Sequence, residues 1–392
     1  MTSNPSPALP YWRLSSYYFF HFAILGVVIP YWSLVLKDRG LDAQSIGELV
    51  AILLVAKTIA PYLWGWLCDH LGHRMTVIRI GTLLAVITFS GLFWANSFWT
   101  LALWMMLYSF FWNANLPQFE AITFNYLREQ VSRYTQIRIW GSIGFMLAVA
   151  ILGWLVDWYS SDIVLPVTLT LFICLWLSTL WVAEPPSIPH PPNQVSLWHI
   201  LRRPVVIAFF ASVFLMQTSH GPYYTFYTLY LDDFGYAKSL IGQLWALCIA
   251  AEIGFFMVAH RCLNRWPVHT LLITSFLAAM LRWVMIALLP ESLIGLICAQ
   301  LLHALTFGLF HATAIHWVHH YFRGRLQGRG QALYSSFCFG AGGAVGSLAS
   351  GYMWEDLGPQ TTYLFAVTLP AISVILIGSC IRSKALVVTP DA

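Results

Sequence analysis

Charged residues are scarce in this chain. Asp, Glu, Lys and Arg make up only 9% of its 392 residues, whereas 59% are hydrophobic; a soluble domain carries about 25% charged residues. So few charges could not cover the surface of a soluble fold of this size, and the composition excludes that class. The 19 tryptophans, 18 tyrosines and 26 phenylalanines suit a protein whose aromatic rings lie at two membrane interfaces.

Several functional motifs are also missing. The seven cysteines show no CxxC or Cys/His metal spacing, which argues against a disulfide framework or a zinc site. No Walker loop occurs, so the sequence encodes no ATP drive, and no paired nucleophile and base or metal cluster indicates an enzyme. The N-terminus lacks the basic region and cleavage site of a signal peptide. The first apolar run is therefore predicted to be a retained membrane span.

Apolar runs of about 20 residues, the length that spans a bilayer, recur along the whole chain. We predict an all-α membrane protein with twelve spans, at 11–36, 43–67, 75–95, 98–125, 135–157, 162–183, 205–231, 239–260, 269–289, 292–318, 328–354 and 360–381. Of the predicted loops on one side, only Lys37, Arg39 and Lys238 are basic, while the other side collects most of the arginines. The positive-inside rule then predicts that both termini and the central connection are cytoplasmic.

The two halves of the sequence resemble each other. A shift of 195 positions superposes Gly47 on Gly242 and Leu49 on Leu244, and it also places Lys57 on Glu252. We predict a six-helix unit at 1–183, a cytoplasmic linker at 184–204 and a second six-helix unit at 205–392, making two pseudo-symmetric bundles. Such a plan favours a carrier in which one half rocks against the other, and channels and receptors do not need it.

The loop after the second predicted span carries Gly65, Asp69, Gly72 and Arg74. The glycines permit a tight turn between helices, and the acid and the arginine can clamp the neighbouring helix ends. This spacing resembles the signature loop of the major facilitator superfamily, in which it is a gating element. It carries no information about the substrate.

Ionisable residues inside spans are costly and usually face the bundle interior. Two groups stand out, with Glu120 and Arg138 able to meet between the fourth and fifth spans, and Glu252, Arg282 and His303 forming a second cluster in spans eight to ten. A carboxylate in such a cluster could load and release a proton. The alternatives are a pair that only locks two helices and a histidine that only makes an interhelical hydrogen bond.

Two further groups of residues are candidates for substrate binding. Asn113 shares a helix face with Glu120 and with Pro117, which should kink the fourth span. His220, Tyr224 and Tyr227 form a stripe on the seventh span, beside a second expected break at Pro222. Such a stripe is more often packing than a binding surface, although the histidine favours a cavity wall.

The segments 138–145, 220–227, 244–253, 281–283 and 301–311 resemble the bacterial phenylpropionate transporter group, in the branch that contains the lactose permease and the nucleoside–proton symporters. The resemblance implies that Glu120 and Arg138 hold substrate and that Glu252, Arg282 and His303 take part in proton coupling. His303 is also a candidate for substrate binding. It departs at Thr306, where the permease has its proton-carrying acid. Glu252 or Glu120 then remains as the proton carrier.

The resemblance implies a proton-coupled symporter that imports a small organic solute, with an aromatic carboxylate as the leading substrate. A sugar or nucleoside symporter is the alternative within transport, and a non-transporting sensor or scaffold is the alternative from another class. We further expect no cofactor, no metal and no nucleic-acid partner, with the proton gradient as the energy source. The expected form is a monomer in the inner membrane of a bacterium.

Overall fold

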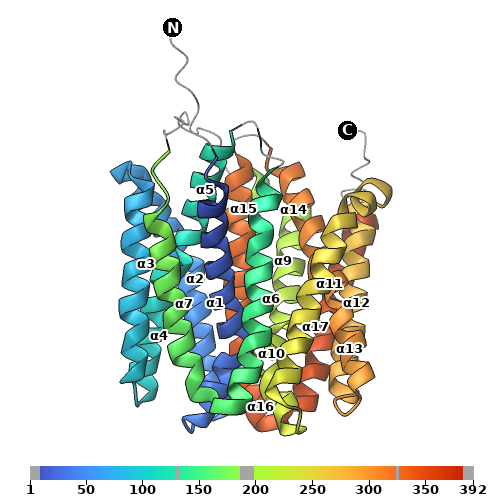
Figure 1. Ribbon diagram of the computed structural model, residues 1–392. Coiled ribbons are helices and arrows are strands. Elements are labelled where there is room, and N and C mark those ends of the chain that lie inside the picture. The colour runs from blue at the N-terminus through green and yellow to red at the C-terminus, as the bar shows by residue number, and fades with distance from the viewer. Residues whose placement is uncertain (1–8, 129, 131–132, 186–197, 324–325, 383–392) are drawn as a thin grey trace.

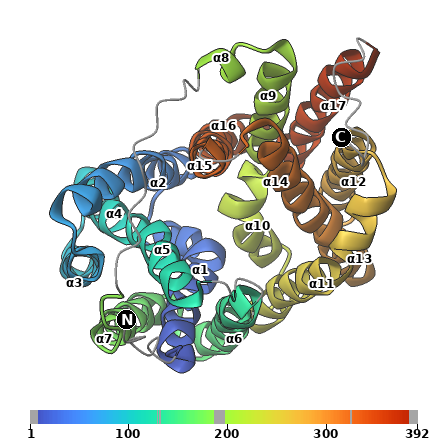
Figure 2. The same cartoon turned by 90° about the horizontal axis from the view of Figure 1, so that it is seen from above.

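The computed structural model describes residues 9–128, 130, 133–185, 198–323 and 326–382. Most residues in these ranges are helical, and the ranges contain no strand. The long helices stand side by side in one bundle (Figure 1) and surround a common centre when viewed end-on (Figure 2). The helices are α1 (Tyr11–Asp38), α2 (Ala43–Leu71), α3 (Arg74–Ser90), α4 (Phe98–Asn113), α5 (Asn115–Leu127), α6 (Tyr134–Tyr159), α7 (Val164–Leu180), α8 (Trp198–Leu201), α9 (Pro204–Ser219), α10 (Gly221–Asp233), α11 (Lys238–Arg265), α12 (Val268–Leu288), α13 (Leu293–Leu301), α14 (Phe310–Tyr321), α15 (Gln327–Ser335), α16 (Gly343–Leu357) and α17 (Pro359–Arg382).

The predicted all-α membrane fold is confirmed. Eleven helices in the described part of the chain are long and apolar enough to cross a membrane. The remaining predicted span, 98–125, corresponds to α4 and α5 together, each of which is too short to be a span by itself. The two therefore form one broken span, which brings the total to the predicted twelve.

Four of the spans are interrupted near their middle. The fourth breaks at Ala114 between α4 and α5, three residues before Pro117, and the seventh breaks at His220, directly before the Pro222 turn of α10. Proline has no N–H and leaves a carbonyl unpaired one turn earlier, so both predicted breaks have the expected cause. The tenth and eleventh spans contain π-helical segments, at Ala304–Leu309 and Ser336–Gly342. Such irregular backbone inside a span is typical of functional sites.

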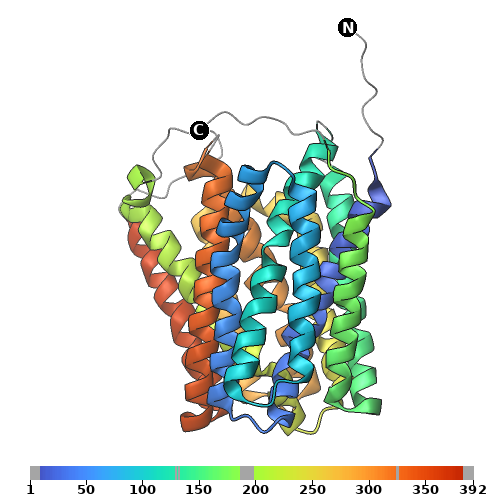
Figure 3. The ribbon, with the colours of Figure 1, turned by 90° about the vertical axis from the view of Figure 1, so that its left-hand side faces the viewer.

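Helices from the two halves of the chain pack closely at two seams. One seam joins α2 to α16 (Figure 3), and the other joins α6 to α11. A Cβ atom added to Gly47 would lie 2.8 Å from the Cα of Gly351, and one added to Gly242 would lie 2.6 Å from the carbonyl oxygen of Val149. Only glycine fits at such distances. Small residues of this kind let membrane helices approach each other closely.

Polar contacts between the halves gather on one side of the bundle. We call the side where α1 begins and α17 ends the terminal side, and the other the opposite side (Figure 1). On the opposite side the Lys37 ammonium lies 2.7 Å from the Asp233 carboxylate. Asp157 at the end of α6 accepts hydrogen bonds from the N–H groups of Lys238 and Ser239, both at 2.9 Å. In this structure the two halves are thus clamped together on the opposite side.

The division into units at 1–183 and 205–392 stays a prediction. Helices α1 to α7 fall in the first range, and α9 begins at Pro204, one residue before the second. Most of the predicted 184–204 linker lies outside the described residues, apart from its two ends and the short helix α8.

A leucine at Gly351 is expected to shift the protein away from this closed arrangement. Its side chain would collide with Gly47 and with the carbonyl oxygen of Ala43, which lies 2.8 Å from an added Cβ. Because tight packing at this seam is bistable rather than deformable, the population should move toward a state open on the opposite side. Spin labels at Tyr159→Cys and Phe234→Cys, in a background without the native cysteines, would report a longer distance.

Gly254→Leu is the matched control for this variant. A Cβ at Gly254 meets no atom within 4 Å, so the substitution should leave the distance distribution unchanged. An unchanged distribution for Gly351→Leu as well would contradict the assignment of this seam as a determinant of closure.

Candidate functional site

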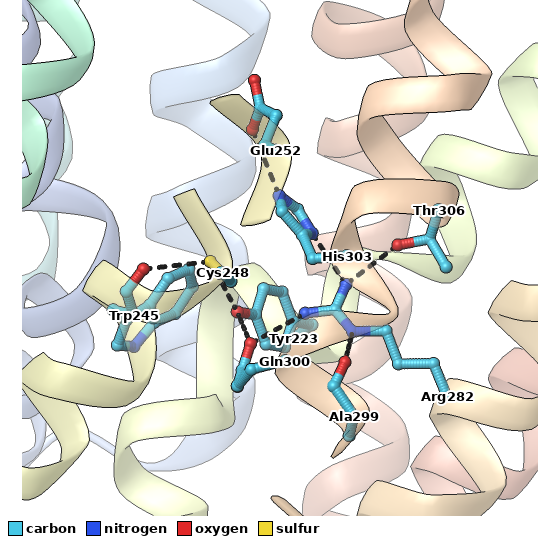
Figure 4. A network of polar contacts seen from close by, with 9 residues as sticks. All are labelled: Tyr223, Trp245, Cys248, Glu252, Arg282, Ala299, Gln300, His303 and Thr306. Carbon is cyan, nitrogen blue, oxygen red and sulfur yellow. Dashed lines mark hydrogen bonds and ion pairs between the residues drawn. The ribbon is translucent and has the colours of Figure 1, made fainter. Parts of the chain in front are cut away.

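A buried arginine organises the polar cluster in the second half of the chain. Arg282 on α12 has no exposed surface and donates four hydrogen bonds (Figure 4). Its Nε donates to the Ala299 carbonyl at 2.9 Å, and its Nη2 donates to Gln300 Oε1 at 3.1 Å. Its Nη1 donates to His303 Nδ1 at 2.9 Å and to Thr306 Oγ1 at 3.2 Å. Every partner is a neutral acceptor. Four of the five guanidinium N–H groups thus have a hydrogen-bond partner, but none of these bonds neutralises the charge.

Aromatic rings cover the same guanidinium. Its central carbon lies 4.1 Å from the Tyr223 ring centroid and 5.0 Å from that of Trp283, within the range of cation–π attraction. The Tyr223 hydroxyl also donates to Gln300 Oε1 at 2.8 Å. Tyr223 thus stabilises the arginine through its ring and holds the glutamine in place through its hydroxyl.

The hydrogen bond from Arg282 fixes the proton on His303. A guanidinium only donates, so His303 Nδ1 must be the acceptor. The neutral imidazole then carries its proton on Nε2, which lies 3.5 Å from Glu252 Oε2 on α11 (Figure 4). The predicted grouping of Glu252, Arg282 and His303 is thus present as a chain with the histidine in the middle.

Glu252 is the accessible member of this chain. Its side chain is 15% exposed, whereas that of His303 is 3% exposed. His303 cannot take a second proton while Nδ1 accepts from Arg282, so a proton entering the cluster has Glu252 as its acceptor. Arg138 of the first half lies within electrostatic range of Glu252. A change in the charge of Glu252 can therefore act on Arg138 in the other half of the chain.

The predicted contact between Glu120 and Arg138 is not formed. Glu120 on α5 accepts a hydrogen bond from the Tyr134 hydroxyl at 3.0 Å. The Arg138 guanidinium on α6 lies over the Phe22 ring of α1, 3.8 Å from its centroid. No ion pair joins the two residues in the described structure, although they remain within electrostatic range. Each charge thus has an aromatic neighbour, Tyr134 for the carboxylate and Phe22 for the guanidinium.

The stripe on the seventh span is mostly buried. His220 and Tyr227 are 2% and 1% exposed, and only Tyr224 keeps partial exposure. His220 Nδ1 lies 2.8 Å from the Met216 carbonyl oxygen, and its ring meets Trp283 edge to face at 4.8 Å. In this conformation His220 and Tyr227 are part of the core, and Tyr224 alone of the three could face a solute.

Asn113 is tied to its own helix. Its Nδ2 donates to the carbonyl oxygen and the hydroxyl of Ser109, at 3.0 and 2.9 Å. The Ser109 hydroxyl in turn donates to the Leu53 carbonyl of α2 at 2.7 Å. This chain links the last turn of α4 to α2, so Asn113 has a structural role in this conformation.

The loop motif forms a compact clamp on the terminal side. Gly65 and Asp69 lie on α2, and Gly72 ends that helix in the left-handed region with φ of 71°, which glycine adopts without strain. Arg74 Nη2 lies 2.6 Å from Asp69 Oδ1. The N–H groups of the first two α3 residues donate to the Glu184 carboxylate, at 3.1 and 2.7 Å. Glu184 thus compensates the positive end of the α3 dipole.

Sequence reasoning missed three members of these arrangements. Gln300 lies three residues before His303, which is about one helical turn and should have placed it on the same face. Tyr223 is adjacent to the predicted Tyr224 but points to the arginine. Glu184 falls in the predicted linker, but its carboxylate accepts a hydrogen bond from the start of α3. No local signal predicts this contact, because Arg74 and Glu184 are 110 residues apart.

Comparison with known proteins agrees with this architecture. The structure superposes on the crystal structure of the nucleoside transporter NupG with a TM-score of 0.80, at 20% sequence identity, covering 95% of this chain and 99% of the other. A bacterial homologue of the human lysosomal transporter Spinster superposes with a TM-score of 0.72, at 15% identity, covering 98% of each chain. The fold is that of a major facilitator membrane transporter.

The family follows from the sequence comparison. The model of the MFS_1 like family matches residues 11–365, and the chain belongs to this family. A probable 3-phenylpropionic acid transporter of Escherichia coli (strain K12) is 28% identical over 90% of this chain and 94% of its own length. The maltose permease of Geobacillus stearothermophilus is 25% identical over 92% of each chain. The protein is therefore a multi-pass membrane transporter of a small solute.

Proposed function

We propose that this transporter is a proton-coupled symporter that imports a small aromatic carboxylate by alternating access. The observation that carries the proposal is the chain from Glu252 through His303 to Arg282. The Glu252 carboxylate lies within the membrane and is partly accessible, and its histidine neighbour is held neutral by a buried arginine. Such a carboxylate suits a site that loads and releases a proton. The proton gradient supplies the energy, and no cofactor is required.

Arg138 is the proposed anchor for the substrate carboxylate. It makes no ion pair within the described residues, and its guanidinium rests on the Phe22 ring. An arginine presents a planar set of donors that matches a carboxylate. The aromatic surroundings, which include Tyr18 with its ring centroid 5.7 Å from the guanidinium, suit the ring of an aromatic acid. The likeness to a probable 3-phenylpropionic acid transporter supports the same class of substrate.

The proposal includes a direction in the membrane. With the terminal side cytoplasmic, as the distribution of basic loop residues favours, the clamped opposite side faces outward. The structure would then represent the state closed to the outside of a bacterial inner membrane. We propose a monomer as the working unit.

A sugar or nucleoside symporter is the second candidate. It draws on relatives that include a maltose permease and nucleoside permeases. In that case Glu120, whose carboxylate accepts a hydrogen bond from the Tyr134 hydroxyl, would also accept hydrogen bonds from hydroxyl groups of a neutral substrate.

Proteoliposomes with an imposed pH gradient test both candidates. Labelled 3-phenylpropionate, maltose and uridine are offered with the acidic side outside. We expect gradient-dependent accumulation of 3-phenylpropionate, abolished by a protonophore. Accumulation of maltose or uridine alone would overturn the aromatic-acid proposal, and accumulation of none would overturn proton symport of these three substrates.

Arg138→Ala is expected to raise the KM for 3-phenylpropionate about ten- to a hundredfold. A charge-assisted hydrogen bond contributes about 1.5–3 kcal/mol, and about 1.4 kcal/mol corresponds to a tenfold change. Glu120→Gln should change KM much less, because the proposal gives Glu120 no contact with the carboxylate. Initial rates of uptake over a range of substrate concentrations measure both. The reverse order of effects, with Glu120→Gln the more damaging, would favour a neutral substrate.

A further inference from the structure

Lys57 lies in the middle of α2 and has no part in the arrangements above. It is one of four lysines in the chain, with Lys37, Lys238 and Lys384. The exposed face of α2 carries Val55, Ile59 and Tyr62, between 45% and 48% exposed. With about 100° of rotation per residue, Lys57 lies about 200° from Val55 and Ile59. Its side chain therefore points away from the exposed apolar face and toward the interior of the bundle.

The neighbours of Lys57 on α2 define this interior position. Trp64 packs against Phe111 of α4, at a ring distance of 5.9 Å. Leu54 and Thr58 face the other half, where added Cβ atoms on Gly343 and Gly340 would contact them. Lys57 falls between these two surfaces on the helical circumference. It therefore lies next to the seam between the halves, near the π segment Ser336–Gly342.

The charges deep in the described spans do not balance. Lys57, Arg138 and Arg282 are cationic, whereas Glu120 and Glu252 are the carboxylates at this depth. Glu120 lies within electrostatic range of Arg138, and Glu252 is linked to Arg282 through His303. No described carboxylate forms an ion pair with Lys57. With both carboxylates ionised, one positive charge is left over, which matches the charge of one monovalent anion.

A buried histidine connects Lys57 to the proposed substrate anchor. The His21 ring on α1 lies 5.3 Å from the ring of Phe22, on which the Arg138 guanidinium rests, and Lys57 is within electrostatic range of His21. It is 2% exposed, and its Nδ1 has no hydrogen-bond partner among the described residues. Its ring stacks on Tyr17 at 5.8 Å and is tilted against Trp112 at 5.3 Å. A cation, an unused polar atom and aromatic surface thus come together beside Arg138.

We propose that Lys57 is a second cationic contact for the carboxylate of the substrate, which binds between Lys57 and Arg138 beside His21. This assignment rests on the proposed function, since it requires an anionic solute. Burying a charge in a membrane span is costly. The assignment explains why Lys57 lies there although no carboxylate of the described residues pairs with it. The substrate supplies the missing negative charge, so binding an acid is favoured over binding a neutral analogue.

Chemical modification of the purified protein tests the contact without relying on transport. The full chain in detergent is treated with formaldehyde and cyanoborohydride, which methylate accessible amines, with and without saturating 3-phenylpropionate. We expect the substrate to lower modification of Lys57 at least fivefold, as measured by peptide mass spectrometry. Lys384, near the C-terminus, takes no part in the contacts between the halves described above and is the internal control, which should not change. A Lys57 that resists modification without substrate, or is modified equally with it, overturns the proposal.

Transport by Lys57 variants supplies the second measurement. Lys57→Gln is expected to raise the KM for 3-phenylpropionate at least tenfold, and Lys57→Arg should restore it to within about threefold of the wild type. Lys384→Gln, beyond the described residues, is the matched control. A KM within twofold of wild type in a folded Lys57→Gln protein would overturn the assignment. If Lys57→Gln does not fold, the modification experiment on the wild type decides alone.

The two proposals fail in distinguishable ways. Proton-driven uptake of 3-phenylpropionate by the wild type, without protection of Lys57, would keep the proposed function and overturn the Lys57 contact. Protection of Lys57 without proton-driven uptake would keep the anion site and overturn proton coupling. The absence of both would overturn both.

Discussion

Replacing Glu252 by glutamine is expected to abolish uphill accumulation of substrate while exchange of substrate across the membrane continues. Glutamine keeps the size and polarity of the side chain but cannot bind and release a proton. The neighbouring His303 cannot take over, because its Nδ1 accepts a hydrogen bond from Arg282 at 2.9 Å. The carrier should then still change conformation around its substrate but no longer couple that change to the proton gradient.

The size of this effect follows from the gradient. One pH unit corresponds to about 1.4 kcal/mol per proton, and hence to an accumulation ratio of about ten for one proton per substrate. Proteoliposomes with Glu252→Gln should equilibrate at a ratio of about one, with counterflow at a rate close to the wild type. Glu291→Gln, in the connection between α12 and α13, is the control and should accumulate normally. Normal uphill accumulation by Glu252→Gln would show that the proton is carried elsewhere.

Replacing Arg282 by methionine should produce the largest loss of stability. The change removes the donor to the Ala299 carbonyl, to His303 Nδ1 and to Thr306 Oγ1, all of them buried. The bilayer interior contains no water that could replace the lost hydrogen bonds. Each buried acceptor left without a donor costs about 1–3 kcal/mol, and relief from burying a charge offsets part of the sum. We expect a net loss of about 2–4 kcal/mol.

The melting temperature of the protein in detergent, followed by size-exclusion chromatography after heating, measures this loss. Arg13→Met is the matched control, because Arg13 is exposed and donates one hydrogen bond, to the Trp181 carbonyl at 3.2 Å. Its removal should change the melting temperature little. Equal melting temperatures for Arg282→Met and the wild type would mean that the network of Arg282 contributes no net stability.

Much of the second-half site could be predicted from the sequence. Glu252, Arg282 and His303 each interrupt an apolar run, and the cost of burying such groups already indicates that they pair. The structure places them in one chain. The order within that chain, with the histidine held between the acid and the arginine, was not predictable. It depends on how α11, α12 and the tenth span pack, which no local pattern encodes.

The arrangement of Glu120 and Arg138 in the first half was less predictable from the sequence. The order of the apolar runs placed Glu120 and Arg138 on consecutive spans, and in the structure they lie on α5 and α6. Their side chains nevertheless turn to other partners, because Phe22 from α1 offers its ring to the guanidinium and the Tyr134 hydroxyl reaches the carboxylate. Phe22 is more than a hundred residues from Arg138 in the sequence. Only the tertiary structure brings it there.

The class of this protein follows from its amino-acid sequence alone. Scarce charge and recurring apolar runs require a bilayer, because a helix satisfies its backbone hydrogen bonds internally and then needs only apolar side chains around it. The breaks at Pro117 and Pro222 are also local consequences of a missing N–H. Which of the few polar groups meet depends on the tertiary packing. Their partners come from distant helices, and the depth and rotation of each helix are set by packing at seams such as Gly47 against Gly351.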